Sequence, residues 1–223
     1  MHIFKSVFFS VWILSCLHVF GQVKGYFYSI DTQHSVLDFK IKHIGFGSVR
    51  GHFDKYDGTI FFDSTDLFKT SASIVIQVET ITTGNGATGR DGIIREEFFQ
   101  VKKYPLIEFT STVVVKRENQ LYLIGDLSMG AFKKKVEIPF IHVAGPSRDQ
   151  FNHMRIAFEG SLELNRKEYD LIYRSNEFWN SIIEDRVVIE MEVGARVYNS
   201  IETVSGSLFS FLRQFVSQMC CQV

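Results

Sequence analysis

The sequence is poor in cysteine and proline and has no excess of charge of one sign. Of its 223 residues 3 are Cys and 3 are Pro, and 24 basic against 25 acidic residues leave a formal net charge of −1. This balance excludes a nucleic-acid-binding polycation, and a hydrophobic content of 45% excludes a disordered chain. Cys16, Cys220 and Cys221 lie near the two ends, so no pair cross-links the body of the chain. The body has to be stabilised by a hydrophobic core instead.

Long apolar runs are scarce, and the clearest one is at the N-terminus. Lys5 precedes an uncharged stretch from Ser6 to Phe20, and the small Gly21 follows it. The stretch is shorter than the roughly 20 residues of a spanning helix, and its order of features is typical of a secretory signal peptide. We predict that residues 1–21 are removed and that the mature protein is exported to the periplasm. The alternative is a lipoprotein box, Ile13-Leu14-Ser15-Cys16, with the protein anchored through an acylated Cys16.

Alternation with a period of two dominates the body, which also contains 16 Gly and 22 Phe. Residues 36–43 place Leu37, Phe39, Ile41 and His43 on one face and mainly charged residues on the other. The same pattern occurs in residues 73–79, 107–116, 154–164 and 187–193, and it places Val113 and Val115 on the apolar face with Phe109. Further strands are expected at 26–31, 58–63, 121–129, 134–143 and 168–174. We predict an all-β fold over residues 22–204, an antiparallel barrel or sandwich of about eight to ten strands.

Two segments interrupt the strands. Residues 82–100 combine a glycine-rich loop with the helical spacing of Ile94, Phe98 and Phe99, which predicts a short helix acting as a lid. Residues 205–223 have apolar side chains at helical spacing, and we predict an amphipathic helix there. That helix either docks on the barrel wall or makes a peripheral membrane contact. The adjacent Cys220 and Cys221 are interpreted as part of a frayed tail, with a vicinal disulfide, an interchain bridge or a soft-metal site as alternatives.

No catalytic motif is apparent. The sequence lacks a Gly-x-Ser-x-Gly elbow, a phosphate-binding loop and a His-Glu-x-x-His helix, so we predict a protein that is not an enzyme. His34, His43 and His52 would form a metal site only if three strands brought them to one depth, and we predict none. His43 lies on an apolar face, where it either has an internal hydrogen-bond partner or meets a ligand.

Two groups of charged residues allow two interpretations each. Asp91 can complement the start of the lid helix, or Arg90 beside it can face a phosphorylated head group. The three lysines Lys133, Lys134 and Lys135 form either a solvated turn or a head-group contact.

A series of short motifs runs through residues 26–194. It consists of Tyr28-Ser29-Ile30-Asp31-Thr32-Gln33-His34-Ser35, Phe39-Lys40-Ile41-Lys42-His43, Val49-Arg50-Gly51-His52-Phe53, Asp57-Gly58-Thr59-Ile60, Asp63, Thr83-Gly84, Arg90-Asp91, Phe98-Phe99, Lys103-Tyr104-Pro105, Glu108-Phe109-Thr110-Ser111, Gly125-Asp126-Leu127-Ser128 and Leu164-Asn165-Arg166. In this order the motifs resemble the YceI-like family of exported, lipocalin-like, polyisoprenoid-binding proteins. The chain departs from the family pattern at Ile93, where a His is usual, and at Ala131-Phe132-Lys133-Lys134, where a Gly-x-Thr-Lys turn is usual.

The resemblance implies a lipocalin-like barrel of about eight strands that binds an isoprenoid lipid of the polyprenyl phosphate or quinone type. A homodimer is a further implication, and no other cofactor is implied. On this basis we expect Phe39, Ile41, Phe109, Phe158 and Ile189 to line the cavity, with Phe98 and Phe99 covering it. The expected polar end consists of His43, Arg90, Asp91 and Tyr104. The alternative is a stress-related periplasmic interaction protein whose barrel is filled by its own side chains.

Overall fold

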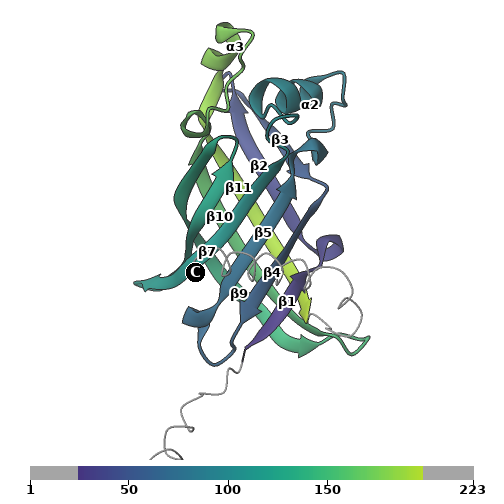
Figure 1. Cartoon of the computed structure of the whole chain (residues 1–223), viewed down its shortest axis with the longest axis vertical. Helices are drawn as coiled ribbons and strands as arrows, with labels where there is room; N and C mark the ends of the chain where they lie inside the picture. The colour runs from purple at the N-terminus through teal and green to yellow at the C-terminus, as the bar shows by residue number, and fades with distance from the viewer. Residues whose placement is uncertain (1–24, 198–223) are drawn as a thin grey trace, which may run out of the picture.

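The computed structural model describes residues 25–197, which contain a closed antiparallel β-barrel (Figure 1). The predicted signal peptide, the predicted helix 205–223 and all three cysteines lie outside this range. The strands of the described part are β1 (Tyr26–Ile30), β2 (Val36–His43), β3 (Gly47–Phe53), β4 (Tyr56–Phe62), β5 (Ser71–Gln77), β6 (Ile81–Thr82), β7 (Leu106–Arg117), β8 (Gln120–Met129), β9 (Phe132–Arg148), β10 (Met154–Asn165) and β11 (Ile183–Val197).

The barrel closes through β11. Hydrogen-bonded neighbours follow the order β1-β4-β5-β7-β8-β9-β10-β11, and β11 then pairs with β1. A single turn of 3-10 helix, Thr32–His34, separates β1 from β2, and both strands pair with β11. In the same way, β3 pairs with β2 and β6, while β4 pairs with β1 and β5. Strands β3 and β4 therefore share one position in the wall, and β6 and β5 share the next. This topology confirms the predicted all-β, lipocalin-like antiparallel barrel of about eight strands.

One irregularity in β7 corrects the sequence-based assignment of inward faces. Ser111 pairs with Gly125 and Val113 pairs with Ile124, so that Thr112 is an extra residue in β7. Such a bulge reverses the alternation beyond it. Val114 is therefore the buried residue, with 3% of its surface exposed, whereas Val113 is 46% exposed. The prediction that Val113 faces the core was wrong.

The connection between β10 and β11 also differs from the prediction. The strand expected at 168–174 is absent from the described structure, and the chain there forms a 3-10 turn, Arg166–Tyr169, and an irregular loop followed by helix α3 (Glu177–Ile182). Asn165 starts the turn, because its side chain accepts a hydrogen bond from the backbone N–H of Lys167 at 3.0 Å. Strand β3, which the alternation did not predict, pairs with β2 from Gly47 to His52.

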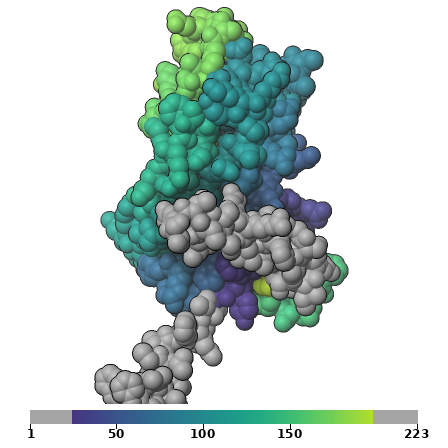
Figure 2. Space-filling model, in the orientation of Figure 1, coloured from purple at the N-terminus to yellow at the C-terminus, as the bar shows by residue number. Residues whose placement is uncertain are grey.

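The predicted lid is a helix that lies across one end of the barrel (Figure 1). Helix α2 (Arg90–Ile93) continues into one turn of π-helix, Ile94–Phe98. In the space-filling view the lid and α3 lie beside one another at the same end of the molecule (Figure 2). None of the helices within residues 25–197 has the length and apolar character needed to cross a membrane.

The barrel interior has two hydrophobic clusters. The first, here called the closed-end cluster, is built around the rings of Tyr28, Phe62, Phe140 and Phe158. These rings meet edge to face, with centroids 5.5 Å apart for Phe62 and Phe158 and 6.0 Å apart for Phe140 and Phe158. The second cluster lies nearer the lid and includes Phe109, Ile138 and Leu162. This second cluster surrounds an open space.

Candidate functional site

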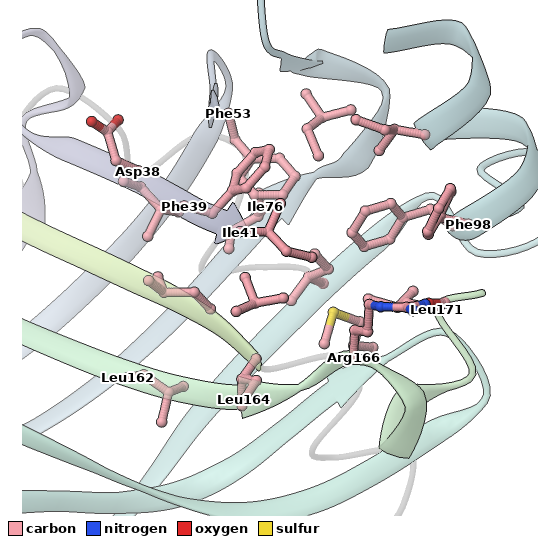
Figure 3. Close-up of a pocket in the computed structure, with 18 of the residues that line it drawn as sticks. Asp38, Phe39, Ile41, Phe53, Ile76, Phe98, Leu162, Leu164, Arg166 and Leu171 are labelled. Carbon is pink, nitrogen blue, oxygen red and sulfur yellow. The ribbon is translucent and has the colours of Figure 1, made fainter. Parts of the chain in front are cut away.

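The most prominent feature of the barrel is an apolar cavity of about 470 Å³ that extends inward from the lid end (Figure 3). Its volume is within the range of small-molecule binding sites. Side chains of β2, β5, β7, β10 and β11 form its walls, and side chains of the lid cover it. The predicted site residues that line this cavity are Phe39, Ile41, His43, Arg90, Phe98, Phe99, Phe109 and Ile189.

Glycines on neighbouring strands leave room for the aromatic rings along the wall. Gly51 lies directly opposite Phe39, and a Cβ atom at Gly51 would come within 2.5 Å of the Phe39 ring. A Cβ atom at Gly125 would come within 2.6 Å of the Phe109 ring. Each ring therefore occupies the place that a neighbouring side chain would otherwise take. The rings pack against the backbone of the wall, and the space at the centre of the barrel remains open.

The lid is attached to the barrel wall by both apolar and polar contacts. The rings of Phe99 and Phe53 meet edge to face with centroids 6.4 Å apart, which joins the lid to β3. The guanidinium of Arg95 donates a hydrogen bond of 2.8 Å to the carbonyl oxygen of Ile81 in β6. These two contacts attach the lid to β3 and β6.

Aromatic pairs surround the mouth of the cavity. Phe98 of the lid stacks on Tyr173 at 5.8 Å, with an angle of 9° between the ring planes. His43 at the end of β2 stacks on Trp179 of α3 at 6.4 Å and 19°. Within residues 25–197 the imidazole of His43 has no hydrogen-bond partner, so the predicted internal partner is absent from this part of the chain. Trp179 is 41% exposed, which places this pair at the entrance.

Arg166 fixes the structure of the mouth. It is only 2% exposed, and its guanidinium donates hydrogen bonds to the carbonyl oxygens of Leu171, Asn180, Ile183 and Glu184 at 2.9–3.1 Å. It also contacts the Asn180 side chain at 3.2 Å and the Asp185 carboxylate at 3.1 Å. Burial lowers the pKa of Arg166, and the neighbouring Asp185 opposes that shift. The sequence contains Arg166 within a family motif, but nothing in it shows this bonding role.

A second arginine connects the mouth loop to the lid. Arg174 donates hydrogen bonds to the backbone carbonyls of Glu97 and Phe98, the latter at 3.1 Å, and pairs with Asp170 at 2.6 Å. The Glu97 carboxylate accepts a hydrogen bond of 3.0 Å from the backbone N–H of Ser175. The lid and the loop that follows β10 are therefore held together in the structure.

Arg90 lies at the cavity mouth and is exposed. Its Nε donates a hydrogen bond of 2.8 Å to the hydroxyl of Thr83, and Nη2 is 3.4 Å from the Thr83 carbonyl oxygen. No partner for its Nη1 is found in the part of the chain that the structure describes. The guanidinium is thus positioned by the loop before the lid and retains donors on its other side.

Asp91 has a structural role, but its hydrogen bonds go to the loop before the lid and none caps the helix, and it does not line the cavity. It is 1% exposed and accepts hydrogen bonds from the Thr83 backbone, the Thr82 hydroxyl and the Gly86 backbone at 2.9–3.1 Å. Burial alone would raise the pKa of Asp91, but the hydrogen bonds from Thr83, Thr82 and Asn85 outweigh it and lower the pKa. The expected contact between Asp91 and a head group is corrected accordingly.

Two other predicted site residues also lie elsewhere. Tyr104 does not line the cavity, and its ring is instead covered by the Lys103 ammonium at 4.9 Å from the ring centroid. Phe158 belongs to the closed-end cluster and borders a second cavity of about 70 Å³. Alternation places Phe158 inside the barrel correctly but contains no information on its depth.

The three regularly spaced histidines do not converge. His34 pairs with Asp31 at 2.9 Å, and His52 pairs with Asp54 at 3.0 Å, while His43 lies at the mouth. Within residues 25–197 no group of three or more His, Cys, Asp and Glu side chains is arranged to hold a metal ion.

Comparison with known proteins agrees with this architecture. The model of the YceI-like domain matches residues 28–195. Curated relatives include a UPF0312 protein of Shewanella denitrificans, 30% identical over 148 residues (65% of this chain and 76% of the relative), and Protein YceI of Escherichia coli, 30% identical over 147 residues (65% and 75%).

Solved structures share the fold at lower identity. Burkholderia cenocepacia BcnA has a TM-score of 0.63 at 21% identity, covering 74% of this chain and 98% of BcnA. A polyisoprenoid binding domain from Saccharophagus degradans has a TM-score of 0.60 at 17% identity, covering 77% and 98%. The family match spans most of the chain and confirms the resemblance carried by the sequence motifs. This chain belongs to the YceI-like family.

Proposed function

We propose that this protein is a non-enzymatic carrier that holds the isoprenoid tail of a polyprenyl phosphate or quinone-type lipid inside the barrel. The observation that carries the proposal is the apolar cavity of about 470 Å³ below the lid. Each methylene that leaves water contributes about 0.8 kcal/mol, so an apolar tail needs only a dry space of the right shape. The fold shared with a structure described as a polyisoprenoid binding domain supports the same ligand class.

The charged groups around the cavity suit orientation of a ligand. The Asp38 carboxylate points away from Phe39 and Ile41 in Figure 3. The guanidinium of Arg166 donates its hydrogen bonds to backbone carbonyls of the mouth. Arg90 keeps donors at the entrance, and its planar guanidinium matches the oxygens of a phosphate. We therefore assign the head group to the lid end, beside Arg90, and the tail to the barrel interior.

The site of action in this proposal is outside the cytoplasm. The N-terminal run from Ser6 to Phe20 supports export, with cleavage after Gly21 or lipidation at Cys16 as two routes. The intact mass of the chain purified from its native cell distinguishes these routes. A chain that retains residues 1–21 in the cytoplasmic fraction would contradict export.

The binding proposal is tested by organic extraction and mass spectrometry of the native protein, followed by titration with geranylgeranyl phosphate. A chain beginning at residue 22 contains Trp179 as its one tryptophan, so the fluorescence of the cavity mouth reports binding directly. We expect a stoichiometric isoprenoid in the extract and a saturable fluorescence change. A lipid-free protein that also fails to take up the added lipid would overturn the proposal.

Two substitutions on β11 provide a matched comparison. Ile189 faces the cavity, whereas its neighbour Glu190 is exposed on the outer surface. We expect Ile189→Lys to weaken lipid binding at least about tenfold, because an ammonium in the cavity opposes burial of the tail. Glu190→Lys should bind as the unmodified protein does. Equal binding by both folded variants would show that the lipid lies elsewhere.

The alternative of a side-chain-filled interaction protein has no comparable support. It required a packed barrel, whereas the described barrel has a cavity of about 470 Å³. The predicted helix 205–223, on which that hypothesis depended, lies outside the described residues.

A further inference from the structure

A group of exposed apolar side chains lies beside the cavity mouth. It consists of Ile44, Phe46, Ile93, Phe178 and Trp179, which we call the apolar rim. Phe46 is 98% exposed and Phe178 is 65% exposed, so both rings stand almost free in water. Of the five residues only Ile93 and Trp179 also line the cavity. Binding of a lipid inside the barrel therefore does not account for the other three.

The rim residues come from segments that meet at the lid end. Ile44 and Phe46 belong to the turn between β2 and β3, and the backbone N–H of Ile44 donates a hydrogen bond of 2.7 Å to the carbonyl oxygen of Ile182 in α3. Within α3 the Phe178 and Trp179 rings meet edge to face at 5.8 Å. Helix α3 lies at the extreme end of the long axis of the barrel, with the lid beside it (Figure 1, Figure 2). The rim is thus accessible to a flat surface.

The conformation of the turn between β2 and β3 gives a second reason to assign Ile44 to an external contact. His43 pairs with Gly47, and in the loop between them Ile44 has a φ of 57° and Gly45 a φ of 72°. Positive φ is unfavourable for a β-branched side chain and is typical of Gly, Asn and Asp. Ile44 gains no burial in exchange, because its side chain is exposed. An apolar residue here suits a contact outside the barrel better than it suits the turn.

We propose that the apolar rim inserts into the surface of a lipid bilayer, so that an isoprenoid chain passes between the bilayer and the barrel without crossing water. The docking surface rests on the proposed function and extends it to the exchange of lipid with a membrane. Tryptophan is enriched at membrane–water interfaces, and Trp and Phe are typical of the apolar face of segments that lie on membranes. The rim lies next to the opening through which the tail has to leave the cavity.

Two features of the mouth favour a bilayer over a second copy of this chain. The first is size, because the rim has only five residues. A stable protein–protein interface takes about 20–30 residues from each partner. The second is charge, because Arg90 lies exposed at the same mouth. Its guanidinium complements the phosphate groups of a bilayer surface.

The test measures binding of the lipid-free chain beginning at residue 22 to phosphatidylcholine vesicles. Trp179 is the one tryptophan of this chain and belongs to the rim. We expect the protein to float with the vesicles and brominated phosphatidylcholine to quench the Trp179 fluorescence. Transfer of geranylgeranyl phosphate from donor to acceptor vesicles is measured in parallel. Residues 205–223 are present in every variant, so a contribution from them is the same throughout.

Phe46→Asp and Phe178→Asp each place a charge in the rim without changing the cavity lining. We expect each to weaken vesicle binding and to slow lipid transfer at least about tenfold, because a carboxylate resists transfer out of water. The ring of Phe46 is almost fully exposed, so Phe46→Asp removes little packing and remains informative should Phe178→Asp unfold α3.

Phe151→Asp is the matched control. Phe151 is 68% exposed, but it lies between β9 and β10, at the end of β10 remote from the mouth. We expect this variant to bind vesicles and to transfer lipid as the unmodified protein does. Affinity for geranylgeranyl phosphate in solution should be the same in all of these variants, because none of the changed residues lines the cavity.

The outcomes separate the docking surface from the proposed function. If the unmodified protein does not bind vesicles, or if folded Phe46→Asp binds them as Phe151→Asp does, the rim does not dock on a membrane. A dimer that Phe46→Asp converts to monomers, with vesicle binding unchanged, would assign the rim to a second copy instead. If vesicle binding depends on the rim but no isoprenoid is taken up, the lipid carrier fails and the docking surface stands. Loss of binding and of transfer confined to the rim variants supports both.

Discussion

The two ends of the barrel are built from the same alternating strands but have different interiors. At the closed end, aromatic rings pack on one another, as in Phe62 with Phe158 at 5.5 Å. At the lid end, Phe39 and Phe109 pack over Gly51 and Gly125 on neighbouring strands, and Phe39 also meets the Phe53 ring with centroids 6.2 Å apart. The two glycines allow the Phe39 and Phe109 rings to lie along the wall. The difference shows that the partner of each ring, more than the number of rings, decides whether the barrel is hollow.

The largest expected effect separates a ring of the closed end from a ring of the cavity wall. Phe62 is 2% exposed and surrounded by side chains, so Phe62→Ala should lower the free energy of unfolding by about 3–5 kcal/mol. Phe39→Ala should cost about 1–2 kcal/mol, because one side of the Phe39 ring faces the cavity and has few contacts to lose. Urea unfolding of the lipid-free protein measures both. Equal costs would contradict the contrast between a packed and a hollow end.

A second effect concerns the mouth, where a buried arginine replaces apolar packing. Arg166→Met should lower the free energy of unfolding by about 2–3 kcal/mol, since the carbonyls of Leu171, Asn180 and Ile183 lose their donor. Faster hydrogen exchange should be confined to residues 170–185, and bound lipid should dissociate faster.

Lys116→Met is the control for the arginine variant, because Lys116 is exposed on β7 and makes no ion pair within the described residues. We expect it to retain the stability and the exchange pattern of the unmodified protein. Exchange that accelerates throughout the barrel in Arg166→Met would show that Arg166 supports the whole fold and has no specific role at the mouth.

The smallest expected effect is a dependence of stability on pH at the closed end. Arg155 joins Asp149 at 2.5 Å and Asp31 at 2.6 Å. The hydrogen bond from Arg155 is the main cause that lowers the pKa of Asp149. Burial would raise the pKa of Asp31, but hydrogen bonds from Arg155 and His34 outweigh it and lower the pKa. Both groups therefore stabilise the fold above their ordinary pKa of about 4, and this contribution is lost as the pH falls further.

Thermal unfolding between neutral pH and about pH 3 tests this dependence. Asp149→Asn should have a lower Tm at neutral pH and a smaller loss of Tm on acidification than the unmodified protein. Asp54→Asn, at an exposed position outside this network, is the control. A pH profile that Asp149→Asn leaves unchanged would show that the Arg155 network does not contribute.

Much of the fold could be predicted from local pattern. Alternation in β2 and β11 places Phe39, Ile41 and Ile189 on the inner face, as the structure does. The helical spacing of Ile94 and Phe98 predicts the lid in the same way. These predictions succeed because strand and helix periods are properties of a few consecutive residues.

The errors arise where contacts between residues far apart in the sequence determine the position of a side chain. Because Thr112 is an extra residue in β7, Val114 lies on the inner face in place of Val113. This bulge depends on the pairing of β7 with β8. The guanidinium of Arg166 donates to carbonyls between Leu171 and Glu184, which come together around it only in the folded chain. The depth of Phe158 depends on strand register, which alternation does not contain.

The sequence by itself determined two-faced strands of an antiparallel barrel or sandwich, because the apolar face of most strands follows from their own alternation, and it determined a lid from a short helical pattern. Only the tertiary structure decided where the barrel is hollow. That outcome depends on which side chain faces which across strands, such as Phe39 opposite Gly51. Register between separate strands sets those pairs, and no local period encodes it.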